Sequence, residues 1–135
     1  MARGEDGQEA DALAALRAEI DRLDGELLER LNARARAAEA VAEVKRRFAE
    51  PGAEDALAFY RPEREAAVLA RLRAANPGPL SDDVIAGLFR EVMSACLALE
   101  APQRVAYLGP EGTFTEQAAE RHFGAFADFR PAPSI

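Results

Sequence analysis

The chain has few of the residues that most often carry nucleophilic, redox or metal chemistry. Among its 135 residues there is one cysteine, Cys96, one histidine, His122, and no tryptophan. A single cysteine excludes an internal disulfide and fits a reducing compartment. One cysteine and one histidine cannot assemble a catalytic triad or a metal-ligand cluster. We therefore expect no metal and no cofactor.

Long apolar runs and a basic surface are also missing. No stretch approaches the roughly 18 consecutive apolar residues that a membrane-spanning helix needs. The first 11 residues, MARGEDGQEAD, are polar and contain no signal-peptide core. The formal net charge is −7, so a uniform basic surface for nucleic acid is excluded. These features predict a cytoplasmic protein that binds neither nucleic acid nor membrane.

What the sequence does contain is a strong helical pattern. Residues 1–11 have no periodicity and are expected to be a disordered tail. Residues 12–48 contain no proline and carry apolar side chains at alternating steps of three and four, which predicts one long helix. Such a helix is about 54 Å long and needs a partner along its length, often a second chain. The predicted seam consists of Leu13, Leu16, Ile20, Leu23, Leu27, Leu31, Arg34, Ala38, Val41, Lys45 and Phe48.

Two cations interrupt this seam. Arg34 and Lys45 are 11 residues apart, which places them about 20° apart around a helix and about 16 Å apart along it. A buried cation is costly unless an anion meets it. Either the pair grips one small dianion, or each side chain reaches solvent or a nearby carboxylate such as Glu39 or Glu43.

The rest of the chain predicts two shorter helices and then a change of texture. A loop is expected over residues 49–59, and a helix beginning at Pro62 and stopping at residues 76–79. A third helix follows Ser81, a candidate N-cap, and ends near residue 101. Beyond it, residues 105–108 suggest a strand, 109–112 a turn, and 117–119 a helix capped by Thr113 or Thr115. We expect residues 104–135 to be loosely ordered, or helical only in part, because they are too few to bury a sheet.

Two further residues matter for the site. Glu100 lies one turn after Cys96 on the apolar face of the third helix. A carboxyl group in an apolar setting favours its neutral form, which can donate a hydrogen bond, although a solvated helix end is the plainer interpretation. Arg17 lies about 42 Å from Lys45 along the first helix, so it serves the same small ligand only from a second chain.

At this point the sequence resembles a known family, the all-helical chorismate mutases. After residue 104 it resembles the start of a prephenate dehydratase domain, as in the bifunctional chorismate mutase–prephenate dehydratases of phenylalanine biosynthesis. The resemblance implies a mutase domain over residues 12–101 and a truncated dehydratase domain over 102–135. The matching segments are LRAEIDRLD at 16–24, LNAR at 31–34, VK at 44–45, YRPERE at 60–65, LFREVMSACLALE at 88–100 and VAYLGPEGTFT at 105–115.

The resemblance implies an all-α protomer of three helices in an intertwined homodimer, with chorismate as substrate. It implies that Arg17 from one chain and Arg34 from the other hold the substrate carboxylates. Lys45 would bind a carboxylate and the ether oxygen, and Glu100 would donate to that oxygen, so these two are the catalytic residues. Glu65 would accept from the substrate hydroxyl, and Arg64 would support the site electrostatically.

Three positions depart from the best-known bacterial pattern. Arg61 stands where an aspartate contacts the substrate hydroxyl, Cys96 replaces a serine, and Glu100 replaces a glutamine. The remaining alternative is a non-catalytic helical module for dimerisation or regulation. Such a scaffold would tolerate the loss of Arg34 and Lys45, but cations on an apolar seam are a poor way to build one.

Overall fold

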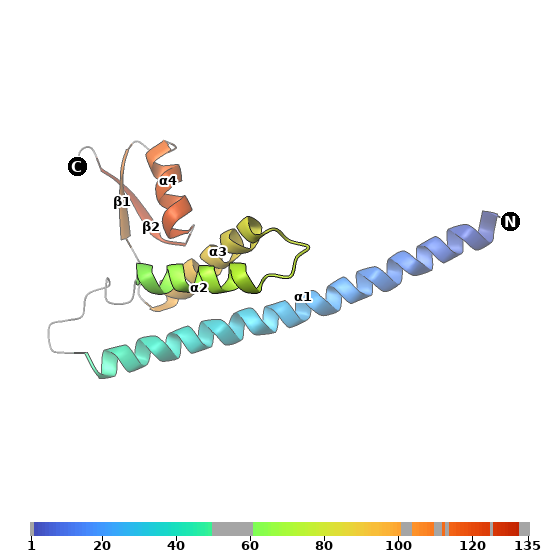
Figure 1. Ribbon diagram of the computed structural model, residues 1–135, viewed down its shortest axis with the longest axis horizontal. Coiled ribbons are helices and arrows are strands. Elements are labelled where there is room, and N and C mark those ends of the chain that lie inside the picture. The colour runs from blue at the N-terminus through green and yellow to red at the C-terminus, as the bar shows by residue number, and fades with distance from the viewer. Residues whose placement is uncertain are drawn as a thin grey trace. The chain divides into compact units, whose positions relative to one another are not determined.

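The computed structural model of the chain describes residues 2–49, 61–100, 104–109, 112, 114–124 and 126–132. It is mostly helical and divides into two compact units, Met1–Arg34 and Ala35–Ile135. The loop predicted over residues 49–59 lies, apart from Ala49, outside the described residues, as does the predicted cap Thr113. The elements are α1 (Ala2–Arg47), α2 (Pro62–Ala75), α3 (Asp82–Glu100), β1 (Arg104–Leu108), α4 (Phe114–Phe123) and β2 (Asp128–Ala132) (Figure 1).

Helix α1 confirms the predicted long first helix but begins about ten residues earlier. The prediction of a disordered tail over residues 1–11 is wrong for residues 2–11, which are helical. Gly4 and Gly7 each cost a helix roughly 1 kcal/mol relative to alanine. Extending an existing helix nevertheless adds one hydrogen bond for each residue that is fixed, and Glu5 in the first turn complements the helix dipole.

The apolar seam of α1 is exposed over most of its length. Leu16 is 61% exposed and Leu27 is 59% exposed, and these residues belong to the unit Met1–Arg34, whose described residues all lie in α1. In the second unit, the side chain of Ala42 is buried, whereas the predicted seam position Val41 is exposed. The buried face of the end of α1 is therefore turned by about one residue from the predicted seam.

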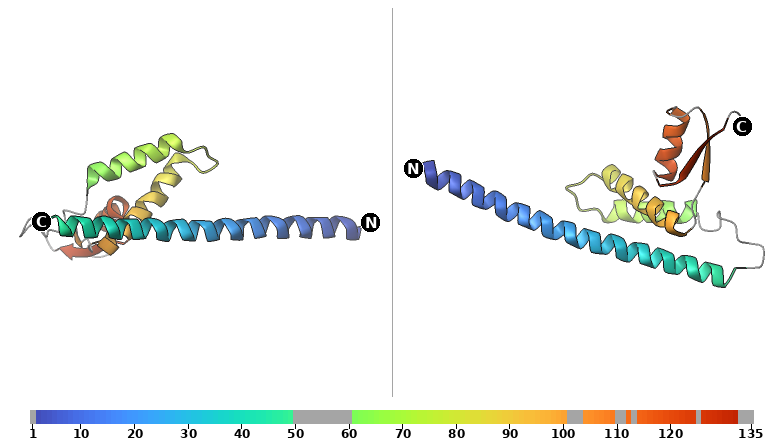
Figure 2. Two further views of the ribbon diagram at one scale, coloured as in Figure 1. Left: turned by 90° about the horizontal axis from the view of Figure 1, so that it is seen from below. Right: turned by 180° about the vertical axis from the view of Figure 1, so that it is seen from behind.

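Helices α2 and α3 form a hairpin that is closed at one end by Asn76 (Figures 1 and 2). The amide Nδ2 of Asn76 donates to the carbonyl oxygen of Leu80 and to Oδ1 of Asp82, both at 2.8 Å. Its Oδ1 accepts from the N–H of Gly78 at 3.2 Å. The predicted stop of the second helix is confirmed, because Asn76 is its C-cap.

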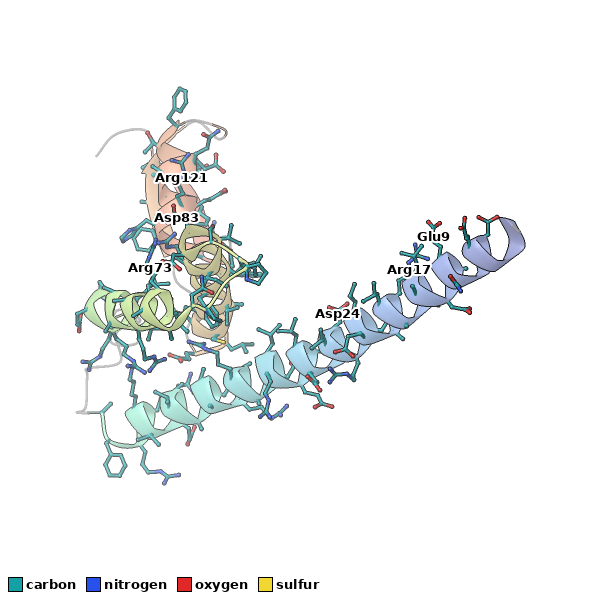
Figure 3. All side chains as sticks on the ribbon, turned by 45° about the vertical axis from the view of Figure 1, so that its right-hand side comes forward. Glu9, Arg17, Asp24, Arg73, Asp83 and Arg121 are labelled. Atoms are coloured by element: carbon teal, nitrogen blue, oxygen red, sulfur yellow. The ribbon has the colours of Figure 1, made fainter. Side chains whose placement is uncertain are left out.

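The starts of both hairpin helices follow the sequence signals. Pro62 is the first residue of α2, where its missing N–H is not needed. Ser81 Oγ accepts from the N–H of Val84 at 3.2 Å, which confirms the predicted N-cap of α3. Next to this end, Arg73 Nη1 lies 2.9 Å from Asp83 Oδ1 (Figure 3). These contacts fix the antiparallel register of the hairpin.

Residues 104–132 form a β–α–β segment. The predicted strand is confirmed as β1, and β2 pairs with it in parallel with Arg104 opposite Asp128. Helix α4 contacts both strands (Figure 1), and Tyr107 of β1 is 2% exposed. The segment is helical only in part, as expected, because α4 is its one helix among the described residues, but the paired strands show that this part is not loosely ordered. Thr115 lies inside α4 and is not its cap.

A search of the described residues finds no helix with both the length and the apolar character of a membrane span.

Candidate functional site

The two seam cations are both half-buried. Arg34 and Lys45 lie on α1 and flank a strip of small residues, of which Ala35 and Ala38 are half-buried and Ala42 is buried. Arg34 forms no ion pair with any residue in the ranges that the structure describes, so pairing with Glu39 or Glu43 is not observed. Alanines at these positions leave room for the long cationic side chains to lie along the helix.

The C-terminal ends of α1 and α3 are joined by a hydrogen bond. Arg46 Nη2 donates to the backbone carbonyl of Glu100 at 2.5 Å. The last turn of α3 contains no basic residue, so its carbonyl ends are met by a cation from another helix. The bond brings Lys45, next to Arg46 in the chain, to the end of α3 that carries Glu100. The two predicted catalytic residues therefore come from adjoining helix ends.

Cys96 and Glu100 lie one turn apart on α3. The side chain of Cys96 is 5% exposed and that of Glu100 is half-buried. The predicted apolar face of α3 is confirmed in part, since Ile85, Phe89, Val92 and Met93 are half-buried but Leu88 is 53% exposed.

The residues at the start of α2 have different environments. Arg61 is the N-cap and is exposed, without a side-chain cap, and its carbonyl accepts from the N–H of Glu65 at 3.0 Å. Arg64 is exposed, whereas Glu65 is half-buried. Burial raises the pKa of Glu65, and the positive charges of Arg90 and His122 oppose this rise without cancelling it. Desolvation is therefore the dominant influence on this carboxyl group.

Sequence reasoning missed three side chains near these positions. Arg46 and Arg90 are not among the predicted site residues, and His122 enters the sequence analysis only as the single histidine of the chain. The hairpin register could have identified Arg90: Arg73 pairs with Asp83, so Glu65, eight residues earlier, lies across from residues near 91. The contacts of Arg46 and His122 carry no comparable signal, because each bridges elements far apart in the chain.

Arg17 remains apart from the other predicted site residues. It is exposed on the part of α1 that forms the first unit, and Figure 3 shows its side chain extending away from the helix axis. A search of the described residues for groups of three or more His, Cys, Asp or Glu side chains placed to hold a metal ion finds none. The predicted site residues are cations, carboxyl groups and the thiol of Cys96, all on helices or at the start of one.

Comparison with known proteins places this arrangement in context. The profile of the family described as chorismate mutase type II matches residues 16–101. The chain is 54% identical over 127 residues to the bifunctional chorismate mutase/prephenate dehydratase of Stutzerimonas stutzeri. It is 56% identical over 125 residues to the protein of that name from Pseudomonas aeruginosa. These two matches cover 94% and 93% of this chain, respectively, but only 34% of each relative. The chain therefore spans about a third of the length of these relatives.

A solved structure is similar to about two thirds of the chain. The chain is 38% identical to the chorismate mutase (form II) from Thermus thermophilus, with a TM-score of 0.58. The match covers 65% of this chain and 92% of that one. The similarity therefore extends over nearly the whole of that solved enzyme.

The environment of Glu65 predicts a pH-dependent contribution to stability. Because burial raises its pKa above the ordinary 4.5, the native state binds its proton more tightly than the unfolded state does. The free energy of unfolding therefore falls as pH rises from 4.5 through the raised value. We therefore expect the melting temperature of Glu65→Gln, relative to that of the unchanged chain, to increase as the pH is raised from about 4 to about 7.

Thermal melting followed by circular dichroism, at one protein concentration, measures this gain. Glu63→Gln is the matched control, since Glu63 lies in the same turn but is exposed. A Glu65→Gln gain that is the same at every pH would contradict the assignment.

Proposed function

The chain belongs to the chorismate mutase type II family, and we propose that it catalyses the Claisen rearrangement of chorismate to prephenate, a step of phenylalanine biosynthesis. The observation that carries this proposal is the pair of half-buried cations on α1, Arg34 and Lys45. The hydrogen bond from Arg46 to the backbone of Glu100 holds Glu100 near the end of α1 that carries Lys45. Local positive charge within a chain of net charge −7 favours a small dianion.

The rearrangement suits this set of residues because it is unimolecular and needs no nucleophile. The protein has to hold chorismate in its compact conformer and to stabilise charge that grows on the ether oxygen. We assign Lys45 and a protonated Glu100 as donors to that oxygen. Arg34 binds a carboxylate. Glu65 accepts from the substrate hydroxyl, with Arg64 as electrostatic support and Arg61 and Cys96 as further substrate contacts.

The active form in this proposal is an intertwined homodimer of three-helix protomers. Its support is the exposed seam of α1: a single helix cannot bury its own apolar stripe, and a second α1 with the same stripe can. In this dimer, Arg17 of the partner subunit completes each site by binding the second substrate carboxylate. The site is then shared between two chains.

The domain assignment follows from the same proposal. Residues 12–101 form the mutase domain, and residues 102–135 are the start of a prephenate dehydratase domain. We expect dehydratase activity only in a full-length chain such as those of the bifunctional relatives, because the β1–α4–β2 segment contains only a two-stranded sheet within the described residues.

Removing either seam cation should abolish most of the activity. We expect Arg34→Ala and Lys45→Ala each to lower kcat/KM for prephenate formation by about 10²- to 10³-fold, because each removes a donor aimed at substrate charge. Arg36→Ala is the matched control, since Arg36 is an exposed cation on the same helix. Full activity in both seam variants would exclude the roles assigned to Arg34 and Lys45, whereas a folded, dimeric unchanged chain that forms no prephenate would favour the non-catalytic helical module.

Sharing of the site between chains predicts recovery of activity on mixing two inactive variants. In a heterodimer of Arg17→Ala and Lys45→Ala chains, one of the two sites receives both native residues. Random pairing makes half of the dimers mixed, so about a quarter of the sites are intact and about a quarter of the activity returns after joint refolding.

The control for this experiment is a mixture of Arg34→Ala and Lys45→Ala chains. Both residues come from the same chain in the proposed site, so neither site of the heterodimer is intact and no activity should return. Equal recovery in the two mixtures, or none in the first, would exclude a site completed by Arg17.

The proposed role of Glu100 predicts how mutase activity depends on pH. A carboxyl group donates a hydrogen bond only when protonated, so activity should fall as rising pH removes the proton. Glu100→Gln carries an amide that donates at every pH and should flatten the profile between about pH 5 and about pH 9. The rate of chorismate loss measures both profiles, and identical profiles would exclude this role.

A further inference from the structure

The β1–α4–β2 segment contacts α3 at a position where only glycine fits. Gly124 follows α4, is buried, and has a φ of +80°, a conformation that L side chains rarely adopt. A Cβ atom on Gly124 would lie 2.4 Å from Cβ of Ser94 and 3.4 Å from the carbonyl oxygen of Arg90. The backbone of the segment therefore approaches α3 more closely than any side chain would permit.

A hydrogen bond accompanies this contact. Ser94 is 6% exposed, and its Oγ accepts from the N–H of Phe126 at 3.3 Å. A buried hydroxyl is costly unless it is hydrogen-bonded, and here the partner comes from the turn between α4 and β2. The close approach of Gly124 and the hydrogen bond of Phe126 converge on one residue of α3, which defines a docking point.

The docking point brings the last turn of α4 to the Arg90 region of α3. His122 lies in that last turn, two residues before Gly124, and Arg90 lies one turn before Ser94. Glu65 of α2 lies across the hairpin from Arg90 and interacts electrostatically with both Arg90 and His122. The half-buried carboxyl group of Glu65 thus interacts electrostatically with one side chain of α3 and one of α4.

We propose that the β1–α4–β2 segment is docked on α3 through Gly124 and Ser94, and that His122, held there, is a positioning residue for the carboxyl group of Glu65. The proposal rests on the proposed function, in which Glu65 accepts from the substrate hydroxyl. Chorismate binding by the mutase helices then depends on the segment that follows them. Arg90 restrains the same carboxyl group from α3, so His122 acts as the second of two restraints.

The test compares His122→Gln with Arg121→Gln in the 135-residue chain. Arg121 is the preceding residue in α4 and is exposed, so its replacement controls for a change in the same turn (Figure 3). We expect His122→Gln to raise KM for chorismate about 3- to 10-fold with kcat changed less than about two-fold, because ground-state binding is weakened. His122→Lys places a cation at the same position and should give a KM close to that of the unchanged chain, and Arg121→Gln should leave both constants unchanged.

Undocking the segment should have the same effect. Gly124→Ala introduces the Cβ that Ser94 cannot accommodate, so KM should rise as in His122→Gln. The double variant, with both Gly124→Ala and His122→Gln, should have a KM no higher than that of the more affected single variant, because both changes disrupt the same interaction. If Gly124→Ala fails to fold, the comparison of His122→Gln with His122→Lys still tests the role of His122.

A spectroscopic readout separates this proposal from the mutase assignment. The chain has one histidine, so its ring resonances in a proton–carbon NMR spectrum belong to His122. Glu65→Gln should displace them at fixed pH and Glu63→Gln should not. If the chain forms no prephenate but Glu65→Gln displaces the His122 resonances, the mutase proposal is wrong and the docking proposal stands. An active chain in which His122→Gln matches Arg121→Gln and Glu65→Gln leaves the ring unchanged overturns the proposal.

Discussion

The constraint on which this protein depends is that a single helix cannot bury its own apolar stripe. The described residues of the first unit, Met1–Arg34, all belong to helix α1, and its leucines are exposed at positions spaced for one face. Burial of apolar area supplies most of the free energy that stabilises folded proteins. The dimer we propose meets this need. It also makes each site depend on residues from two chains.

The second unit is held together more by helix ends than by a large core. Apart from Tyr107, its buried residues are small or medium-sized, such as Val68, Ala86 and Cys96, and no large side chain among the described residues is below 2% exposed. Asn76 closes one end of the α2–α3 hairpin, and Arg46 joins α1 to the opposite end of α3. A loosely filled set of helices leaves polar side chains such as Lys45 and Glu65 half-buried, where electrostatic interactions are stronger than in water.

Positive charge is locally concentrated in an otherwise acidic chain. A cation beside small alanines on α1 and a carboxyl group beside Arg90 and His122 are both polar groups withdrawn from water. The charged form of the carboxyl group is favoured by Arg90 and His122 of other helices, so its environment depends on how the helices pack. The contact of Gly124 with Ser94 extends this dependence to the β1–α4–β2 segment, which joins two parts of the chain that the sequence presents as separate modules.

The sequence by itself determined the features that local signals specify: the long first helix, the strand β1, the start of α2 at Pro62, the Ser81 and Asn76 caps, and the family. The tertiary structure decided the pairing of β2 with β1, the hydrogen bond from Arg46 to Glu100, and the close contact of Gly124 with Ser94. It also showed that Ala42 rather than Val41 is buried. The physical reason is range: caps and periodicities act within a few residues, whereas these contacts join residues up to 54 positions apart and leave no periodic trace in the sequence.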